Sequence, residues 1–121
     1  MKNAAQLYGN VAKQISSPRN LEANLLLEAA ARMQAVHDDW NGKRGRLDHA
    51  LRYNRRLWTV FLTSVTSSDN PLPREIRQNV ANLGLFVMKQ TIALVGDPKP
   101  EQLGSLISIN REIAGGLLAR N

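Results

Sequence analysis

One short stretch of the chain, residues 52–62 (RYNRRLWTVFL), places three arginines among large aromatic side chains. These residue types bind single-stranded nucleic acid in some proteins, because bases stack on the rings while guanidinium groups hold the phosphates. They also form the apolar and solvated faces of ordinary helices. The stretch belongs to a basic patch, residues 43–56, which holds much of the net charge of +6 and contains one acid, Asp48, beside Lys43, Arg44, Arg46, Arg52, Arg55 and Arg56.

Helical phase separates the aromatic residues of this stretch from most of its charge. At 100° per residue, Trp58 and Phe61 share a broad apolar face, whereas Arg52 and Arg56 share the opposite one. Trp58 and Phe61 are therefore predicted to be core residues rather than a platform for bases. Tyr53 lies on the shoulder beside Arg56, where it either stacks on that guanidinium or covers the edge of the domain.

Asn54 lies near the centre of the same apolar face, where an unpaired amide is costly, so it needs a hydrogen-bonding partner. The C-terminal part of the chain repeats the pattern at a constant offset of 56 residues, which pairs Asn54–Arg55 with Asn110–Arg111. We predict that Asn54 and Asn110 are structural amides buried between helices, bonded to each other or to exposed backbone ends. The alternative is a chance match between two amphipathic helices.

The remaining polar residues lack the spacing of known catalytic and metal sites. His37 and His49 fall on different predicted elements without a helical HExxH-type spacing, and the acids stand singly apart from Asp38 and Asp39. No cysteine is present, and no glycine-rich phosphate loop follows a strand. We therefore expect no catalytic residue, metal, cofactor or small-molecule substrate, and a protein that is not an enzyme.

Helices must position these side chains, because apolar residues recur at helical spacing and no run alternates. A chain of 121 residues fits one domain. The sequence predicts an all-α fold, a single-domain bundle of about five helices over residues 1–121. The expected helices are a weakly amphipathic first segment with Ala4, Tyr8, Val11 and Ile15, followed by residues 18–40, 47–65, 73–95 and 100–118, with a turn at residues 41–45.

The predicted helix 73–95 is apolar on two nearly opposite sides. One side carries Leu85, Met88 and Ile92, and the other carries Val80 and Val87. Such a helix lies either at the centre of a bundle or at its edge with a partner protein on its outer side. We favour the central position, because small domains rarely expose large apolar patches.

No segment of the sequence has the length and apolar character of a signal peptide or a bilayer-spanning helix. The absence of cysteine suits a reducing compartment. We expect a cytoplasmic protein with no membrane partner.

Four ordered blocks resemble the flagellar biosynthesis regulator family FlaF. They are residues 17–33 (SPRNLEANLLLEAAARM), 53–61 (YNRRLWTVF), 70–89 (NPLPREIRQNVANLGLFVMK) and 106–117 (LISINREIAGGL). The resemblance implies a non-enzymatic protein that acts on flagellin, is required for its production or export, and works together with the translational regulator FlbT. It brings no catalytic residues, and the basic turn at residues 38–46 matches no motif of the family.

Two functions of different classes remain. In the favoured one, flagellin or an FlbT-type regulator packs a helix on an apolar surface with an arginine rim. In the alternative, the basic patch binds flagellin mRNA, since clustered cations bind phosphates. A solvated basic face without a partner is also compatible with the patch. The expected partner-binding residues are Arg52, Tyr53, Arg55, Arg56, Leu85, Met88 and Ile92.

Overall fold

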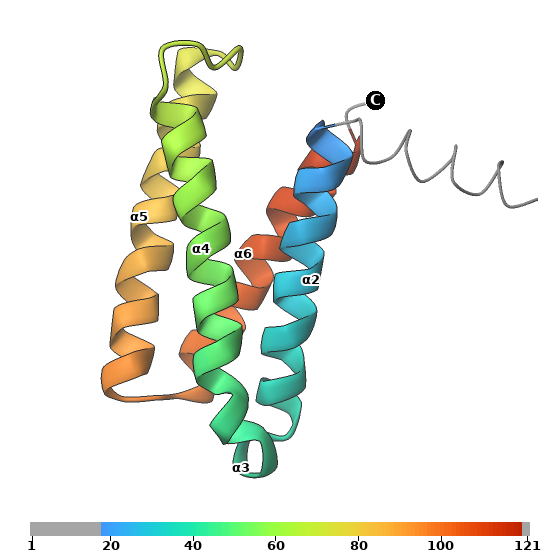
Figure 1. Cartoon of the computed structure of the whole chain (residues 1–121), viewed down its shortest axis with the longest axis vertical. Coiled ribbons are helices and arrows are strands. Elements are labelled where there is room, and N and C mark those ends of the chain that lie inside the picture. The colour runs from blue at the N-terminus through green and yellow to red at the C-terminus, as the bar shows by residue number, and fades with distance from the viewer. Residues whose placement is uncertain (1–17, 120–121) are drawn as a thin grey trace, which may run out of the picture.

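The computed structural model describes residues 18–119, and this part of the chain is helical with no strand. The all-α prediction is confirmed. The helical segment expected at residues 4–15 lies outside the described residues. The elements are α2 (Pro18–Asp38), α3 (Trp40–Lys43), the 3-10 turn η1 (Arg44–Arg46), α4 (Leu47–Thr66), α5 (Arg74–Gly96) and α6 (Pro100–Ala119), shown in Figure 1.

The four long helices begin and end close to the predicted positions, and the predicted turn at residues 41–45 is present but has a helical conformation. That stretch forms α3 and η1, which reverse the chain between α2 and α4. At Gly42 a Cβ would lie 2.6 Å from Oδ2 of Asp39, so the missing side chain leaves room for the Asp39 carboxylate. Local helical hydrogen bonds thus replace an open loop.

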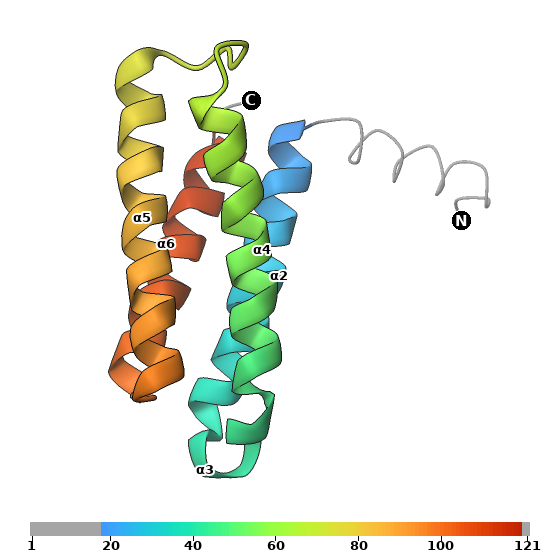
Figure 2. The ribbon, with the colours of Figure 1, turned by 60° about the vertical axis from the view of Figure 1, so that its left-hand side comes forward.

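The helices form two antiparallel pairs. α2 packs along α6 for most of its length, and α4 packs along α5, as Figures 1 and 2 show. The two pairs are joined mainly by contacts between α2 and α4, and contact between α5 and α6 is slight. No helix in the described part of the chain is long and apolar enough to cross a bilayer.

The core lies between the pairs and contains apolar side chains from every long helix. Trp58 of α4 is fully buried, and its ring meets that of Phe61 edge to face at 5.7 Å between centroids. This contact uses the apolar area and the preferred geometry of two aromatic rings. The largest buried apolar side chains are Trp58, Leu26, Met33, Leu94, Leu103 and Leu106.

A hydrogen-bonded group of three side chains crosses this core. Nδ2 of Asn110 donates to Oδ1 of Asn54 at 2.7 Å and to the carbonyl oxygen of Leu26 at 3.3 Å. The indole N–H of Trp58 donates to Oδ1 of Asn110 at 3.0 Å. All three side chains are fully buried, so Asn110 of α6 joins α4 to α2 where water cannot replace these bonds.

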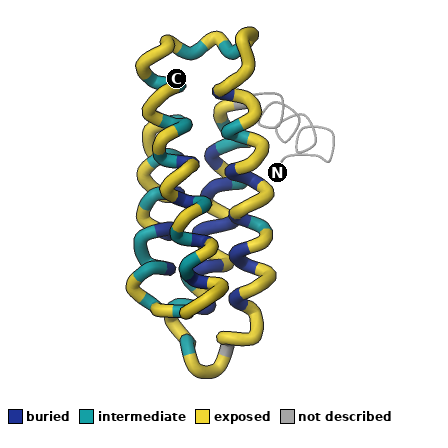
Figure 3. The backbone as a smooth tube through the Cα atoms, turned by 90° about the vertical axis from the view of Figure 1, so that its left-hand side faces the viewer, coloured by how far each residue is buried: buried dark blue, intermediate teal, exposed yellow. Residues whose placement is uncertain are grey.

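The expected central position of the helix at residues 73–95 is wrong, because α5 lies at the edge of the bundle (Figure 1). Its buried residues, Gly84, Val87, Thr91 and Leu94, form a single narrow face. The apolar face of α6 packs on α2 instead, which leaves the far side of α5 uncovered. Figure 3 views the molecule from this side, and exposed residues run along the nearest helix.

Candidate functional site

A row of apolar side chains runs along the outer side of α5. Leu85, Ile92 and Val95 are 57%, 72% and 65% exposed, and Met88 is half-buried. These four residues, here named the α5 strip, follow one another at spacings of three, four and three residues. That is the spacing with which one helix meets another in a coiled coil. The strip is a ready contact surface for a helix.

The arginines of α4 flank one side of the α5 strip. Arg52 and Arg55 line a shallow depression of about 200 Å³ between α4 and α5, together with Val95 and with the acid Asp48. On the other side of the strip, Lys89 is exposed. The structure therefore brings two of the predicted arginines to the Val95 end of the strip, and cations lie on both sides of it.

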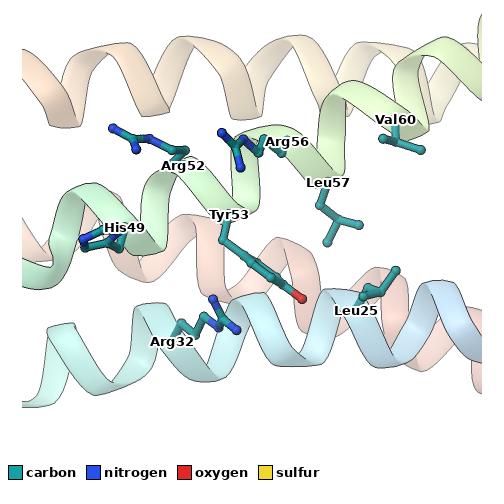
Figure 4. Close-up of a pocket in the computed structure, with 8 residues that line it drawn as sticks. All are labelled: Leu25, Arg32, His49, Arg52, Tyr53, Arg56, Leu57 and Val60. Atoms are coloured by element: carbon teal, nitrogen blue, oxygen red, sulfur yellow. The ribbon is translucent and has the colours of Figure 1, made fainter.

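The other predicted residues of α4 face a groove on the opposite side of this helix. The groove lies between α2 and α4, has a volume of about 480 Å³, and is here named the α2–α4 groove (Figure 4). It is lined by Leu25, Arg32, His49, Arg52, Tyr53, Arg56, Leu57 and Val60. Arg52 lines both the groove and the depression beside the α5 strip.

The guanidinium that stacks on Tyr53 comes from α2, not from the neighbouring Arg56. Figure 4 shows Tyr53 projecting from α4 toward α2, where the guanidinium carbon of Arg32 lies 4.0 Å from the ring centroid. Nε of Arg32 also donates to Oε1 of Glu28 at 3.0 Å. Stacking of Tyr53 on Arg56, one of the two alternatives, is therefore wrong, whereas Tyr53 does cover the edge of the core.

The basic patch at residues 43–56 is divided by the fold. The guanidinium of Arg44 lies 5.5 Å from the ring of Trp40, whereas Arg46 lines a cavity between α2 and α4 that shares Arg32 and His49 with the α2–α4 groove. Arg55 points to the α5 side. Cations that are neighbours in the sequence are therefore divided between the α2 side and the α5 side of α4.

A small apolar cavity of about 90 Å³ lies between the helices near the loop that joins α4 to α5. Its lining includes Trp58, Phe61 and Leu72, with Glu22 of α2 beside them. Burial raises the pKa of the Glu22 carboxyl above its usual value, and the charge of Arg19 partly offsets this. Among the described residues, no group of three or more His, Cys, Asp and Glu side chains is arranged to hold a metal ion.

A match to a family model identifies the family of the chain that carries these surfaces. The model of the flagellar protein FlaF matches residues 4–117. The chain belongs to the FlaF family. The comparisons with curated proteins and with solved structures found no match. In this FlaF chain the match spans α2, α4, α5 and nearly all of α6, so it includes the α5 strip and the arginines of α4.

Two residues of these surfaces in the FlaF chain were not among the expected partner-binding residues. Val95 of the α5 strip shares the helical phase of Leu85, Met88 and Ile92, which the sequence indicated, but it was left out of that set. Arg32 of α2 had no such signal, because it meets Tyr53 only when α2 packs on α4. Sequence periodicity therefore finds the residues of one helix face but not the neighbours supplied by another helix.

Proposed function

We propose that this FlaF-family protein is a non-enzymatic regulator of flagellin synthesis and export that acts in the bacterial cytoplasm by binding other proteins. Its partner is flagellin or an FlbT-type regulator, and its action is that of a chaperone or adaptor. The observation that carries the proposal is the exposed α5 strip. Large exposed apolar patches on a small domain mark surfaces that another protein covers.

The geometry of the strip favours a helix as the bound element. Leu85, Met88, Ile92 and Val95 form a single straight row, which fits the apolar face of an amphipathic helix lying along α5. Burying one such side chain completely contributes about 1.5–3 kcal/mol. Ile92 is the most exposed of the four and has the most surface to bury.

The cations beside the strip favour an acidic partner. Within residues 18–119, no ion pair involves Arg52, Arg55 or Lys89. A second copy of this protein would bring like charges together across the contact, which is unfavourable. A partner helix with acidic residues beside its apolar face would instead be steered into place and held in one orientation.

Binding of flagellin mRNA through the basic patch is the second candidate, and it has less support. Trp58 is fully buried and Phe61 packs on it, so neither ring is free to stack on a base. One face of Tyr53 is covered by Arg32. The remaining attraction for RNA is the charge of the arginines alone.

The proposal is tested by capture of purified flagellin and of the FlbT-type regulator on immobilised protein. Ile92→Glu places a charge in the middle of the α5 strip and should weaken capture at least tenfold, since about 1.4 kcal/mol corresponds to a factor of ten. Leu27→Glu is the matched control, because Leu27 of α2 is 38% exposed and lines neither the depression beside the α5 strip nor the α2–α4 groove. Equal capture by the two variants would refute the role of the α5 strip.

The same assay separates the two candidate functions. Protein binding through the strip should survive nuclease treatment and weaken moderately with salt. RNA binding requires release of counterions, so affinity would fall steeply between low and physiological salt. Tight binding of the flagellin leader RNA together with failure to capture either protein would contradict the chaperone or adaptor function.

A further inference from the structure

The α2–α4 groove continues past the residues shown in Figure 4. A second cavity of about 350 Å³ shares Arg32 and His49 with it and adds Arg46, Val36 and Ala50. The lining of the joined groove runs from Arg46, the last residue of η1, to Val60 of α4, a length of roughly 21 Å at 1.5 Å per helical residue. A peptide segment of roughly 14 helical residues matches that length.

The two ends of the groove differ in chemistry. One end is aliphatic, formed by Leu25, Leu57 and Val60. The other end is cationic, with Arg32, Arg46, Arg52 and Arg56, and no acidic side chain is among its described lining residues. Among residues 18–119, no ion pair involves Arg46, Arg52 or Arg56. Unpaired cations beside an aliphatic surface are complementary to a segment that carries both carboxylates and apolar side chains.

Arg32 is already held in position at the centre of the groove. Its Nε is bonded to Glu28 and its guanidinium is stacked on Tyr53, so two contacts restrict its rotamers. These contacts engage Nε and one face of the group and leave its terminal N–H groups to meet a carboxylate. A fixed guanidinium loses less side-chain entropy on binding than a free one.

We propose that the α2–α4 groove is a second docking site, which takes an acidic segment of another protein. The carboxylates of the segment lie at the Arg46 end, and its apolar residues lie against Leu57 and Val60. A nucleic acid would satisfy the cations but leave the aliphatic end without a partner, and the groove offers it no free pair of aromatic faces.

The groove is separate from the α5 strip, because α4 stands between α2 and α5. Arg52 alone lines both the groove and the depression beside the strip. A protein with both sites holds two partners at once, one on each side of α4. The groove does not depend on the function proposed for the α5 strip, and either site can be lost without the other.

The test measures fluorescence anisotropy of a labelled peptide of roughly 14 residues, a helix long enough to span the groove. Its first half is rich in glutamate and its second half is rich in leucine. The full-length protein is titrated with this peptide, with a peptide in which lysine replaces glutamate, and with a single-stranded RNA of similar charge. We expect only the acidic peptide to bind in physiological salt, with Arg56→Glu and Val60→Glu each weakening it at least tenfold.

Two control variants make the result specific to the groove. Arg111→Glu makes the same charge change on α6, outside both surfaces, and Ile92→Glu alters the α5 strip; both should bind the acidic peptide like the wild type. Helicity and thermal unfolding confirm that each variant is folded. No binding of the acidic peptide, equal loss in Arg111→Glu, or stronger binding of the RNA would overturn the proposal. Loss of flagellin capture in Ile92→Glu with intact peptide binding would show two independent sites.

Discussion

Replacing Asn110 by leucine should destabilise the protein far more than the same change at Asn54. The two side chains have the same branching as leucine, so the change mainly removes hydrogen bonds. Asn110→Leu leaves two buried groups without a partner, the indole N–H of Trp58 and Oδ1 of Asn54. At about 1–3 kcal/mol for each orphaned group, the cost is about 2–6 kcal/mol. The Leu26 carbonyl loses only a long contact of 3.3 Å and, within α2, keeps its intrahelical acceptor role.

Asn54→Leu should cost only about 1–3 kcal/mol, because it orphans a single N–H of Asn110. It also removes Nδ2 of Asn54, which is buried without a partner in the described part of the chain. In the double variant, only the Trp58 N–H is left unpaired. The double variant should therefore be more stable than Asn110→Leu alone by about 1–3 kcal/mol, and cheaper than the sum of the two single changes by about 2–6 kcal/mol.

Urea unfolding followed by circular dichroism gives the three free energies of unfolding that this comparison needs. The m-value of each variant must equal that of the wild type, so that the differences reflect the folded state. An Asn54→Leu variant less stable than Asn110→Leu would show that Asn110 is not the centre of the network. Additive costs in the double variant would show that the two amides do not interact.

Two further predictions concern stability away from the proposed docking sites. Gly84→Ala should destabilise the protein by about 1–3 kcal/mol, because a Cβ there would lie 2.6 Å from Cδ2 of Leu62. Gly115→Ala meets no atom within 4 Å and should stabilise the protein by about 0.5–1 kcal/mol. Thermal unfolding of both variants checks this, and an unchanged unfolding temperature in Gly84→Ala would mean that α4 and α5 are not closely packed. Glu22 has a pKa raised by burial, so the folded protein loses stability as the pH rises from 4.5 through the higher folded-state pKa. Glu22→Gln should therefore raise the unfolding temperature at about pH 7 and leave it nearly unchanged at about pH 4, and a gain of equal size at both values would assign the effect to packing.

Local sequence signals predicted most of the helices. Apolar residues at helical spacing predicted the four long helices, and Pro73 and Pro98 lie where α5 begins and ends. The phase of α4 correctly separated buried Trp58 from exposed Arg52 and Arg56. These features depend on one helix at a time, which explains why the sequence was sufficient for them.

The pairing of Asn54 with Asn110 was also visible in the sequence, for a different reason. A polar residue in the centre of an apolar face needs a hydrogen-bonding partner, and two helices carried an asparagine at the same position of their apolar faces. The sequence did not indicate that the Trp58 indole would join them. That bond depends on how deeply α6 packs between α2 and α4.

The sequence alone determined the helices of the described residues, their amphipathic faces and the arginine-rich helix, because these follow from residue type and periodicity within single segments, and its four ordered blocks indicated the FlaF family. Only the tertiary structure decided which faces found a partner. α6 packs on α2 and leaves α5 at the edge, so Leu85 and Ile92 are exposed although their pattern equally fits a core helix. The same packing brings Arg32 to Tyr53 and divides the basic patch between two sides of α4. Periodicity within one helix specifies that a face is apolar, whereas the packing of the helices on one another specifies whether that face is buried.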